Sequence, residues 1–286
     1  MNFSNRGTKI YRFIRRYPIL PVFIIVVLGL AAVGAPLYPV DPLTSDLMKV
    51  RQPPAWLEGG SFNMVLGADF IGRDILSRII HGSKISLLVA AIVLVIGGTI
   101  GTTLGIVAGY AGGLWEELIM RLVDMTYAIP FLLVALVAAV VFGASLTLLC
   151  VLLTLFTWPG FSRQTRGLTL QLKDTDYVAA ARIAGASPLR IGIKHILPGL
   201  INIVIVLGTL QVGSLILTES VLSFLGVGIP APTPAWGSMV SDGRAFISNA
   251  WWISVMPGMA IFITVFAFNF LGDWLRDYFD PRLRQM

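Results

Sequence analysis

Long apolar stretches without a charged residue alternate with charged segments along the chain. They cover residues 19–37, 85–115, 125–162, 195–218 and 245–272. A helix needs about 20 predominantly apolar residues to cross a hydrocarbon core of about 30 Å. The stretch at 125–162 is too long for one crossing, and the sequence FGAS at residues 142–145 predicts a turn that divides it. The pattern therefore predicts six membrane helices.

The composition of the chain agrees with the prediction of membrane helices. Apolar residues make up 56% of the chain and charged residues 13%, whereas soluble domains carry about 25% charged residues. We therefore expect an all-α integral membrane protein. Its single cysteine, Cys150, excludes an intramolecular disulfide and is interpreted as a packing residue in an apolar run. The net charge of +6 does not indicate nucleic-acid binding, because the basic residues lie mainly between the predicted helices.

The basic residues also predict the orientation. With the N-terminus inside, the inner segments hold 15 of the 21 Lys and Arg and the outer segments 6, so the positive-inside rule places both termini in the cytoplasm. Five of the six outer charges lie in the first outer loop. A secretory signal peptide is the alternative for the first stretch, but that stretch is longer than the usual apolar region of about 7–15 residues. An uncleaved first helix is predicted.

This topology divides the chain into successive parts. They are a cytoplasmic N-terminal tail (1–17), a first transmembrane helix (18–38), an extracytoplasmic loop (39–84), a five-helix core (85–275) and a cytoplasmic tail (276–286). The core contains a cytoplasmic loop at 163–197 and an outer loop at 227–250.

The second predicted helix has glycine at every fourth position, which places these residues on one face: Gly97, Gly101, Gly105 and Gly109. Small residues at this spacing let another helix approach closely. We expect a helix-packing face in the core of a permease, although generic membrane packing gives the same pattern.

The fifth predicted helix carries a polar stripe formed by Gln211, Ser214 and Thr218, followed by Glu219. Such a stripe faces protein or water rather than lipid. It either lines a solute path or supplies hydrogen bonds between helices. No series of Asp, Glu or His crosses the predicted membrane centre, so a proton-coupled carrier is not favoured.

Signatures of enzymes are missing. The segment GGTIGTTLG lacks the Lys-Ser/Thr of a phosphate-binding loop, and His81 and His195 have no partner at metal-ligand spacing. Asp69 and Asp74 flank Arg73, which predicts an ion pair in a structured turn before a surface helix. We expect a transport subunit rather than an enzyme, with no cofactor and no metal of its own.

Between the fourth and fifth predicted helices lies DYVAAARIAGASPLRIGIKHILPG, residues 176–199. Asp174 or Asp176 can cap a first short helix, which three alanines at 179–181 keep slim. Gly185 can end that helix in a left-handed turn.

The same segment then predicts a second short helix. Ser187 supplies its N-cap and Pro188 its first turn, and Pro198 opens the next membrane helix. Arg182 and Arg190 offer charges to an acidic partner. The two helices form either an element that docks on another protein or an interfacial hairpin that only anchors the loop.

This hairpin resembles the cytoplasmic loop of binding-protein-dependent ABC importer permeases. The family pattern is Glu-Ala-Ala, three residues, Gly, nine residues, Ile-x-Leu-Pro. The matching positions are Ala180, Ala181, Gly185, Leu197 and Pro198. Ala179 replaces the Glu of the pattern. His195 replaces the Ile, and this form resembles the dipeptide and oligopeptide subgroup.

Residues 66–87, 219–244 and 266–284 resemble the same subgroup, so the similarity covers nearly the whole chain after about residue 60. The chain resembles the C-type permease subunit of dipeptide, oligopeptide and nickel importers. The resemblance implies a type I ABC importer permease fold in the inner membrane of a prokaryote. It also implies a second permease subunit, two subunits that bind ATP and magnesium, and an extracytoplasmic solute-binding protein.

On this resemblance the chain translocates di- or oligopeptides. Nickel, glutathione or another small solute are the alternatives, and an ATP-independent secondary carrier is a rival from another class. The implied ATPase-coupling residues are Asp176, Ala180, Ala181, Arg182, Gly185, Ala186, Ser187, Pro188, His195, Leu197 and Pro198. In the outer loop, Pro230, Pro234 and Trp236 form either part of an extracellular gate or a rigid capping segment.

Overall fold

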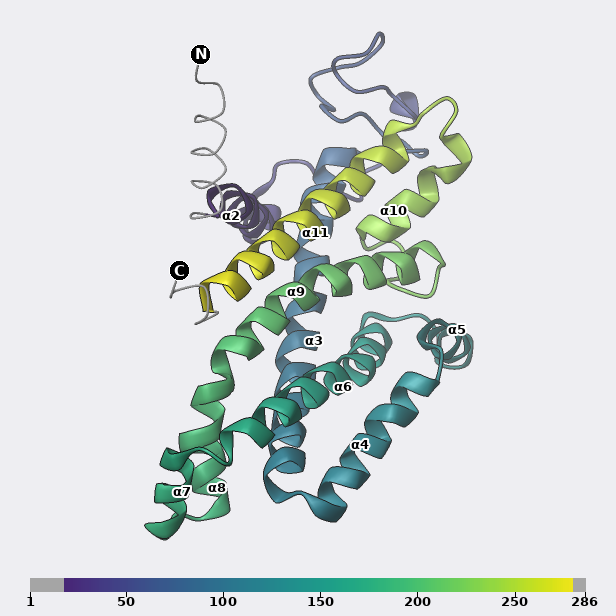
Figure 1. Cartoon of the computed structure of the whole chain (residues 1–286). Helices are drawn as coiled ribbons and strands as arrows, with labels where there is room; N and C mark the ends of the chain where they lie inside the picture. The colour runs from purple at the N-terminus through teal and green to yellow at the C-terminus, as the bar shows by residue number, and fades with distance from the viewer. Residues whose placement is uncertain (1–17, 280–286) are drawn as a thin grey trace, which may run out of the picture. The chain divides into compact units, whose positions relative to one another are not determined.

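The computed structural model describes residues 18–279 and, within them, contains helices and connecting segments but no β-strand (Figure 1). The pairing of Ala68 with Asp74 is an isolated bridge. The all-α prediction is confirmed. The helices are α2 (Ile19–Gly34), α3 (Ile75–Ala111), α4 (Gly113–Ala128), α5 (Phe131–Phe142), α6 (Leu146–Leu172), α7 (Asp176–Ile183), α8 (Pro188–Ile191), α9 (Leu197–Phe224), α10 (Trp236–Gly243) and α11 (Trp252–Phe279). The predicted tail at 1–17 and residues 280–286 of the other tail lie outside the described residues.

Five helical stretches within residues 18–279 are long and apolar enough to cross a membrane: Ile19–Leu37, Ile75–Ala111, Leu146–Leu172, Pro188–Phe224 and Trp252–Phe279. Helices α4 and α5 meet the same criterion only as a pair, and they are bent by 78° where they join. Counted as one broken span, this pair completes the six predicted membrane helices. The chain is a multi-pass membrane protein.

The break in the third span was not predicted. Pro130 has no backbone N–H and disfavours a helical conformation in the residue before it, and Ile129 is extended, with φ −95° and ψ 123°. The predicted turn at the other end of α5 is confirmed. Gly143 there has φ 78°, and Ser145 Oγ accepts a hydrogen bond from the backbone N–H of Leu148 at 3.1 Å to cap α6.

Helix α3 begins at Ile75, ten residues before the predicted start of the second span at residue 85. The prediction of a separate surface helix ahead of that span is therefore wrong. Asp74 Oδ2 caps α3 by accepting from the Ser77 N–H at 2.9 Å. Arg78 is only 3% exposed, and its guanidinium pairs with Asp69. Because this ion pair compensates the charge, Arg78 does not end the membrane helix.

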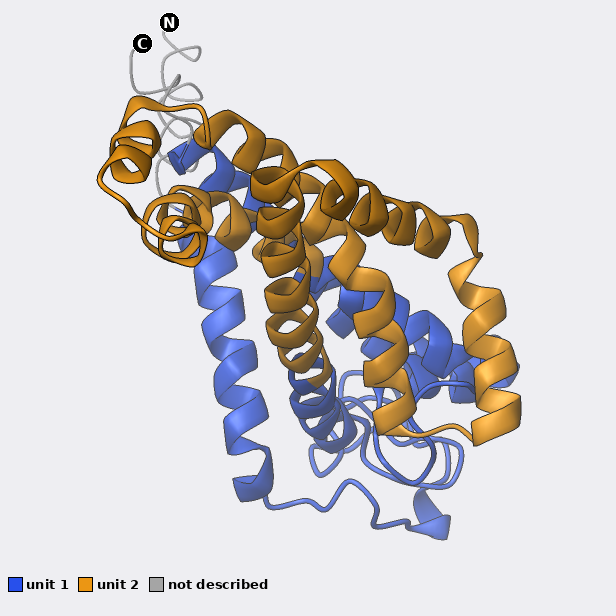
Figure 2. Cartoon of the chain, turned by 90° about the horizontal axis from the view of Figure 1, so that it is seen from below, with its two compact units in different colours: residues 1–88, 212–286 blue, residues 89–211 orange. Residues whose placement is uncertain are grey.

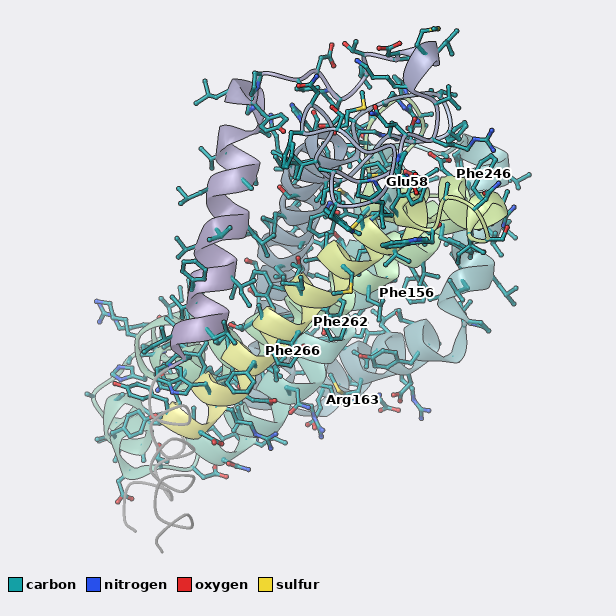
Figure 3. All side chains as sticks on the ribbon, turned by 90° about the horizontal axis from the view of Figure 1, so that it is seen from above. Glu58, Phe156, Arg163, Phe246, Phe262 and Phe266 are labelled. Carbon is teal, nitrogen blue, oxygen red and sulfur yellow. The ribbon has the colours of Figure 1, made fainter. Side chains whose placement is uncertain are left out.

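The chain forms two compact units, which Figure 2 colours separately. The first contains the described residues up to 88 and from 212 onward, and the second contains residues 89–211. In the first unit, α2 and α10 both pack on α11. Phe262 and Phe266 stack on successive turns of α11 with ring centroids 6.2 Å apart (Figure 3).

In the second unit, the glycine face of α3 lies against α6. It contains Gly97, Gly101, Gly105 and Gly109. A Cβ atom added to Gly101 would lie 2.7 Å from Cβ of Phe161, and one added to Gly109 would lie 2.7 Å from Cβ of Thr169. The two helix backbones therefore approach too closely for a side chain at these two positions. Gly97 is less restricted, since its nearest neighbour would lie at 3.4 Å.

Candidate functional site

The segment between α6 and α9 forms a helical hairpin (Figure 1). Its first helix, α7, follows Thr175, which is extended (φ −78°, ψ 151°) and occupies the N-cap position. The prediction that Asp174 or Asp176 is the N-cap is therefore wrong. Thr175 Oγ1 donates to the Leu172 carbonyl at 2.6 Å instead of capping α7. Asp176 lies in the first turn, where a carboxylate interacts favourably with the helix dipole.

The corner of the hairpin is a Schellman motif centred on Gly185. Gly185 N–H donates to the Arg182 carbonyl and Ala186 N–H donates to the Ala181 carbonyl, both at 3.1 Å. Gly185 has φ 78°, which confirms the predicted left-handed turn. No heavy atom lies within 4 Å of a Cβ added there. Backbone conformation, not lack of space, therefore makes glycine the suitable residue.

The second helix begins as predicted. Ser187 Oγ accepts from the Arg190 N–H at 3.4 Å, and Pro188 occupies the first helical position. Pro188 fits there because the first turn of a helix leaves its N–H groups without helical partners.

This second helix is not separate from the membrane helix, contrary to the prediction. Helix α8, the π-helical segment η3 (Gly192–Ile196) and α9 follow one another without a break. Pro198 lies just inside α9 rather than opening a new helix, and it has no N–H to donate. Immediately before it, the helix widens so that Leu197 N–H donates to the Gly192 carbonyl. A local π-turn of this kind accommodates a residue that does not fit the regular hydrogen-bond ladder.

Four fully buried aliphatic side chains fasten the hairpin to its own unit: Val178, Ile191, Ile196 and Leu200. Partly buried side chains of α3 and α6, including Ile106 and Leu168, pack against them. Tyr177 Oη donates to the His195 carbonyl at 3.3 Å, which ties α7 to η3. The hairpin is therefore a packed extension of the membrane helices.

The outer surface of the hairpin is partly apolar. Ile183 and Leu189, on either side of the Gly185 corner, are 89% and 73% exposed. Arg182 and Arg190 are exposed beside them and form no ion pair with a carboxylate in residues 18–279. We call Ile183, Leu189, Arg182 and Arg190 the hairpin tip. Contiguous exposed apolar patches mark interaction sites, and the hairpin tip is a candidate for one.

Part of the predicted polar stripe on α9 is exposed on the surface of the chain. Ser214 is exposed, and Gln211 and Thr218 are partly exposed. Thr218 Oγ1 donates to the Ser214 carbonyl at 2.8 Å, one turn earlier in the same helix. The stripe therefore remains available to a solute path or to a neighbouring helix.

Glu219 does not share that exposed position, since it is 1% exposed. Its Oε2 accepts from Ser86 Oγ of α3 at 3.1 Å, and its Oε1 accepts from Ser223 Oγ of α9 at 2.8 Å. Ser223 Oγ in turn accepts from the Ile229 N–H at 3.4 Å. Glu219 thus joins α3, α9 and the outer segment after α9.

Trp236 of the outer segment is completely buried. Its indole N–H donates to the Ile79 carbonyl of α3 at 2.9 Å, and a Cβ added to Gly82 would lie 2.8 Å from the indole ring. Pro234 is also buried, whereas Pro230 is exposed. Trp236 is therefore packed against α3, and both the gate and the capping segment stay predictions.

A buried ion network adds to the same region. Arg73 Nε donates to Asp69 Oδ2 at 2.6 Å, so the predicted ion pair is present. Asp69 also pairs with Arg78, and both guanidinium groups lie 3.9 Å from Asp242 of α10. The pKa of Asp242 is raised above its ordinary value, because the effect of burial exceeds the opposing effect of Arg78 and Arg73. No group of three or more His, Cys, Asp or Glu in residues 18–279 is placed to hold a metal ion.

Two ion pairs join α4 to α6 in the second unit. Arg166 pairs with Glu116, and Arg163 (Figure 3) pairs with Asp124 at 2.7 Å. The guanidinium of Arg163 also lies 5.1 Å from the ring centroid of Tyr127. Neither pair was predicted from the sequence, because the α4 charges lie between two apolar stretches and were interpreted as part of a connecting loop. Charges spaced four residues apart were the signal for an amphipathic helix there.

Comparisons with known proteins place these features in context. Residues 101–285, which include the whole hairpin, match the family described as binding-protein-dependent transport system inner membrane component. The dipeptide transport system permease protein DppC of Escherichia coli (strain K12) is 43% identical over 264 residues, covering 92% of this chain and 88% of the relative. The di/tripeptide transport system permease protein DppC of Pseudomonas aeruginosa (strain UCBPP-PA14) is 38% identical over 246 residues, which cover 86% of this chain and 81% of the relative. The glutathione transport system permease protein GsiD of Shigella sonnei (strain Ss046) is 42% identical over 226 residues, which cover 79% of this chain and 75% of the relative.

Proposed function

The chain belongs to the family of binding-protein-dependent transport system inner membrane components, as its sequence predicted, and we propose that it is the permease subunit of an ATP-driven importer of small peptides. Relatives named for dipeptide, di/tripeptide and glutathione transport support this substrate class. Glutathione is itself a short peptide, so the three names share one chemistry.

In this proposal the chain pairs with a second permease subunit and receives solute from an extracytoplasmic binding protein. Two separate subunits hydrolyse ATP, and both termini of this chain lie in the cytoplasm. Support for the division of labour comes from the chain itself, since its glycine-rich segment lacks the Lys-Ser/Thr of a phosphate-binding loop. An outward-facing stripe at Gln211, Ser214 and Thr218 contributes to the solute path.

The hairpin is the coupling element in this proposal. Its tip presents Ile183 and Leu189 to an apolar groove on one ATPase, while Val178 and Ile191 hold it to the membrane helices. ATP binding closes the ATPases, which moves the docked hairpin and turns the permease pair outward to receive solute. Hydrolysis and product release reset the arrangement. A ligand shifts such an equilibrium only if it binds the two states differently.

Ala179 is exposed where the family pattern has Glu. Docking in this chain therefore depends on the shape of the corner and on the apolar contacts of the tip rather than on a carboxylate at that position.

Reconstituted complexes test the proposal. Ile183→Asp and Leu189→Asp should lower both the recovery of ATPase with the permease and the ATP-driven uptake of a labelled dipeptide. Phe62→Asp is the matched control, because Phe62 is 87% exposed in the loop before α3 and takes no part in the hairpin. Unchanged recovery and uptake in both tip variants would refute docking through the tip. Dipeptide uptake by the purified chain alone, without ATPase, would instead favour a secondary carrier.

A further inference from the structure

An apolar pocket of about 360 Å³ lies in the second unit, where the end of α3 meets α8, η3 and the start of α9. Its walls include Ile106, Val107, Tyr110, Leu189, Ile193 and Leu197. The volume falls in the range of small-molecule sites, about 300–1,000 Å³. Several wall residues face outward from the chain, since Val107 is 38% exposed and Ile193 56% exposed. Leu189 also belongs to the hairpin tip, and Leu197 is among the residues that the family resemblance implies for coupling.

One basic side chain lies beside the wall of this pocket. The guanidinium of Arg182 lies over the ring of Tyr110, 5.9 Å from its centroid, so a cation is held against a residue of the pocket wall. Arg182 does not pair with a carboxylate in the part of the chain that the structure describes. The border of the pocket therefore carries positive charge that no described residue neutralises.

The pocket also lies at the end of membrane-spanning helices. Ile75–Ala111 and Pro188–Phe224 are both long and apolar enough to cross a membrane. The wall residues occupy the last turns of the first stretch and the first turns of the second. Tyr110 lies one residue before the end of α3, and Tyr is enriched where hydrocarbon gives way to lipid headgroups. An occupant at this level meets apolar pocket walls on one side and the Arg182 guanidinium on the other.

We propose that this pocket binds an anionic phospholipid. An acyl chain packs against Ile106, Val107 and Ile193, and the headgroup phosphate meets the Arg182 guanidinium above Tyr110. Basic pockets between membrane helices are known to take anionic headgroups. An apolar helix from a neighbouring subunit would cover the same walls but would leave Arg182 without an anion, whereas an anionic lipid satisfies both features.

Binding here has a consequence for the hairpin. Gly192 and Ile193 of the π-helical segment η3 form part of the pocket wall, and η3 joins the hairpin tip to α9. A lipid packed on η3 restricts the motion of this irregular segment. The regulatory consequence rests on the proposed coupling function, but lipid binding itself does not.

Photolabelling tests the binding step directly. The full chain, purified with the subunits that accompany it, is placed in nanodiscs of phosphatidylcholine that contain phosphatidylglycerol with a diazirine in its acyl chain. After illumination, mass spectrometry should find the label in peptides that contain residues 102–111 and 188–197. Arg182→Gln should lower this labelling about fivefold, the effect expected for one basic residue near an anionic surface. Val107→Trp should lower it by filling the pocket from α3.

Two further variants control the experiment. Arg121→Gln removes a charge from α4 that is 69% exposed and pairs with Glu117 at 3.6 Å, and it should leave the labelling unchanged. Arg182→Lys keeps the positive charge and should retain most of the labelling, which separates loss of charge from misfolding.

Equal labelling by a phosphatidylcholine probe with the same chains would overturn the proposal, as would labelling that is unaffected by Arg182→Gln and Val107→Trp. Crosslinking of a photoreactive residue at position 193 to a protein subunit instead of lipid would also overturn it, because the pocket would then be a protein interface. Labelling requires no transport, so its outcome is independent of the proposed peptide uptake.

Discussion

Gly185 offers a direct test of whether the shape of the hairpin matters for coupling. We consider Gly185→Asn, Gly185→Ala and Gly185→Val. No heavy atom lies within 4 Å of a Cβ added at this position, so none of the three variants is expected to clash through its Cβ. What changes is the ease with which the backbone holds φ 78°. The series therefore perturbs the corner while the buried anchors of the hairpin stay intact.

The size of the effect follows from the backbone. An L-residue other than Asn or Asp in the left-handed region costs about 1–2 kcal/mol, which lowers the population of the corner by about 5- to 30-fold. Val costs more, because a β-branched residue is a strong outlier at positive φ. Asn costs less, since it is the common alternative to Gly at this position. If the corner opens, the hydrogen bonds of Gly185 N–H and Ala186 N–H are lost, at about 1 kcal/mol each.

Uptake of a labelled dipeptide and recovery of ATPase with the permease should therefore fall in the order Gly, Asn, Ala, Val. Gly167→Ala is the matched control, because Gly167 lies inside α6 with no heavy atom within 4 Å of an added Cβ and without positive φ. Ala in a helix interior is favoured over Gly by about 1 kcal/mol, so this variant should assemble and transport normally. If Gly185→Val shows wild-type uptake, assembly and amide protection at the corner, the prediction that coupling depends on the shape of this corner is refuted.

Three further predictions concern packing in the membrane helices. Gly109→Val should lower the midpoint of thermal unfolding in detergent, with a cost of about 1–3 kcal/mol, because its Cβ would lie 2.7 Å from Cβ of Thr169; an unchanged midpoint would contradict the close approach of α3 and α6. Glu219→Leu should lower the free energy of unfolding by about 1–3 kcal/mol, because two serine hydroxyls lose their acceptor. Glu219→Gln keeps one carbonyl oxygen and should lower it less in the same measurement. Equal midpoints for wild type and Glu219→Leu would argue against these hydrogen bonds as a stabilising contact. Trp236→Phe should weaken amide protection of α10, because the indole N–H bond to α3 is lost; full protection would mean that other contacts hold α10.

Local signals in the sequence predicted the features that depend on a few neighbouring residues. Gly185 ends α7 in a left-handed turn and Ser187 with Pro188 starts α8, because these residue types satisfy helix-end geometry by themselves. The turn after α5 was predictable for the same reason. The N-cap of α7 was predicted at Asp174 or Asp176 but lies at Thr175, since neighbouring polar residues compete for the same position.

Features that depend on distant residues could not be predicted in this way. The charges Arg78 and Lys84 suggested that the second span begins at residue 85, but α3 begins at Ile75. Arg78 is compensated by Asp69 and also lies 3.9 Å from Asp242 of α10, and the spacing of charges in the sequence does not reveal the approach of α10. Burial of Trp236 against the backbone of α3 was equally hidden, since a Trp among prolines fits an exposed loop as well as a buried anchor.

The sequence by itself determined that the chain is an all-helical membrane protein with about six crossings, because a bilayer selects long apolar helices whatever their arrangement. It also determined the corner of the hairpin and the family to which the chain belongs. The tertiary structure decided that the hairpin continues into α9 through a π-turn, that the third span is broken, and that Glu219 is a buried node rather than part of the outward-facing stripe. Each of these depends on which surfaces meet within a unit, and contacts between residues far apart in sequence decide that.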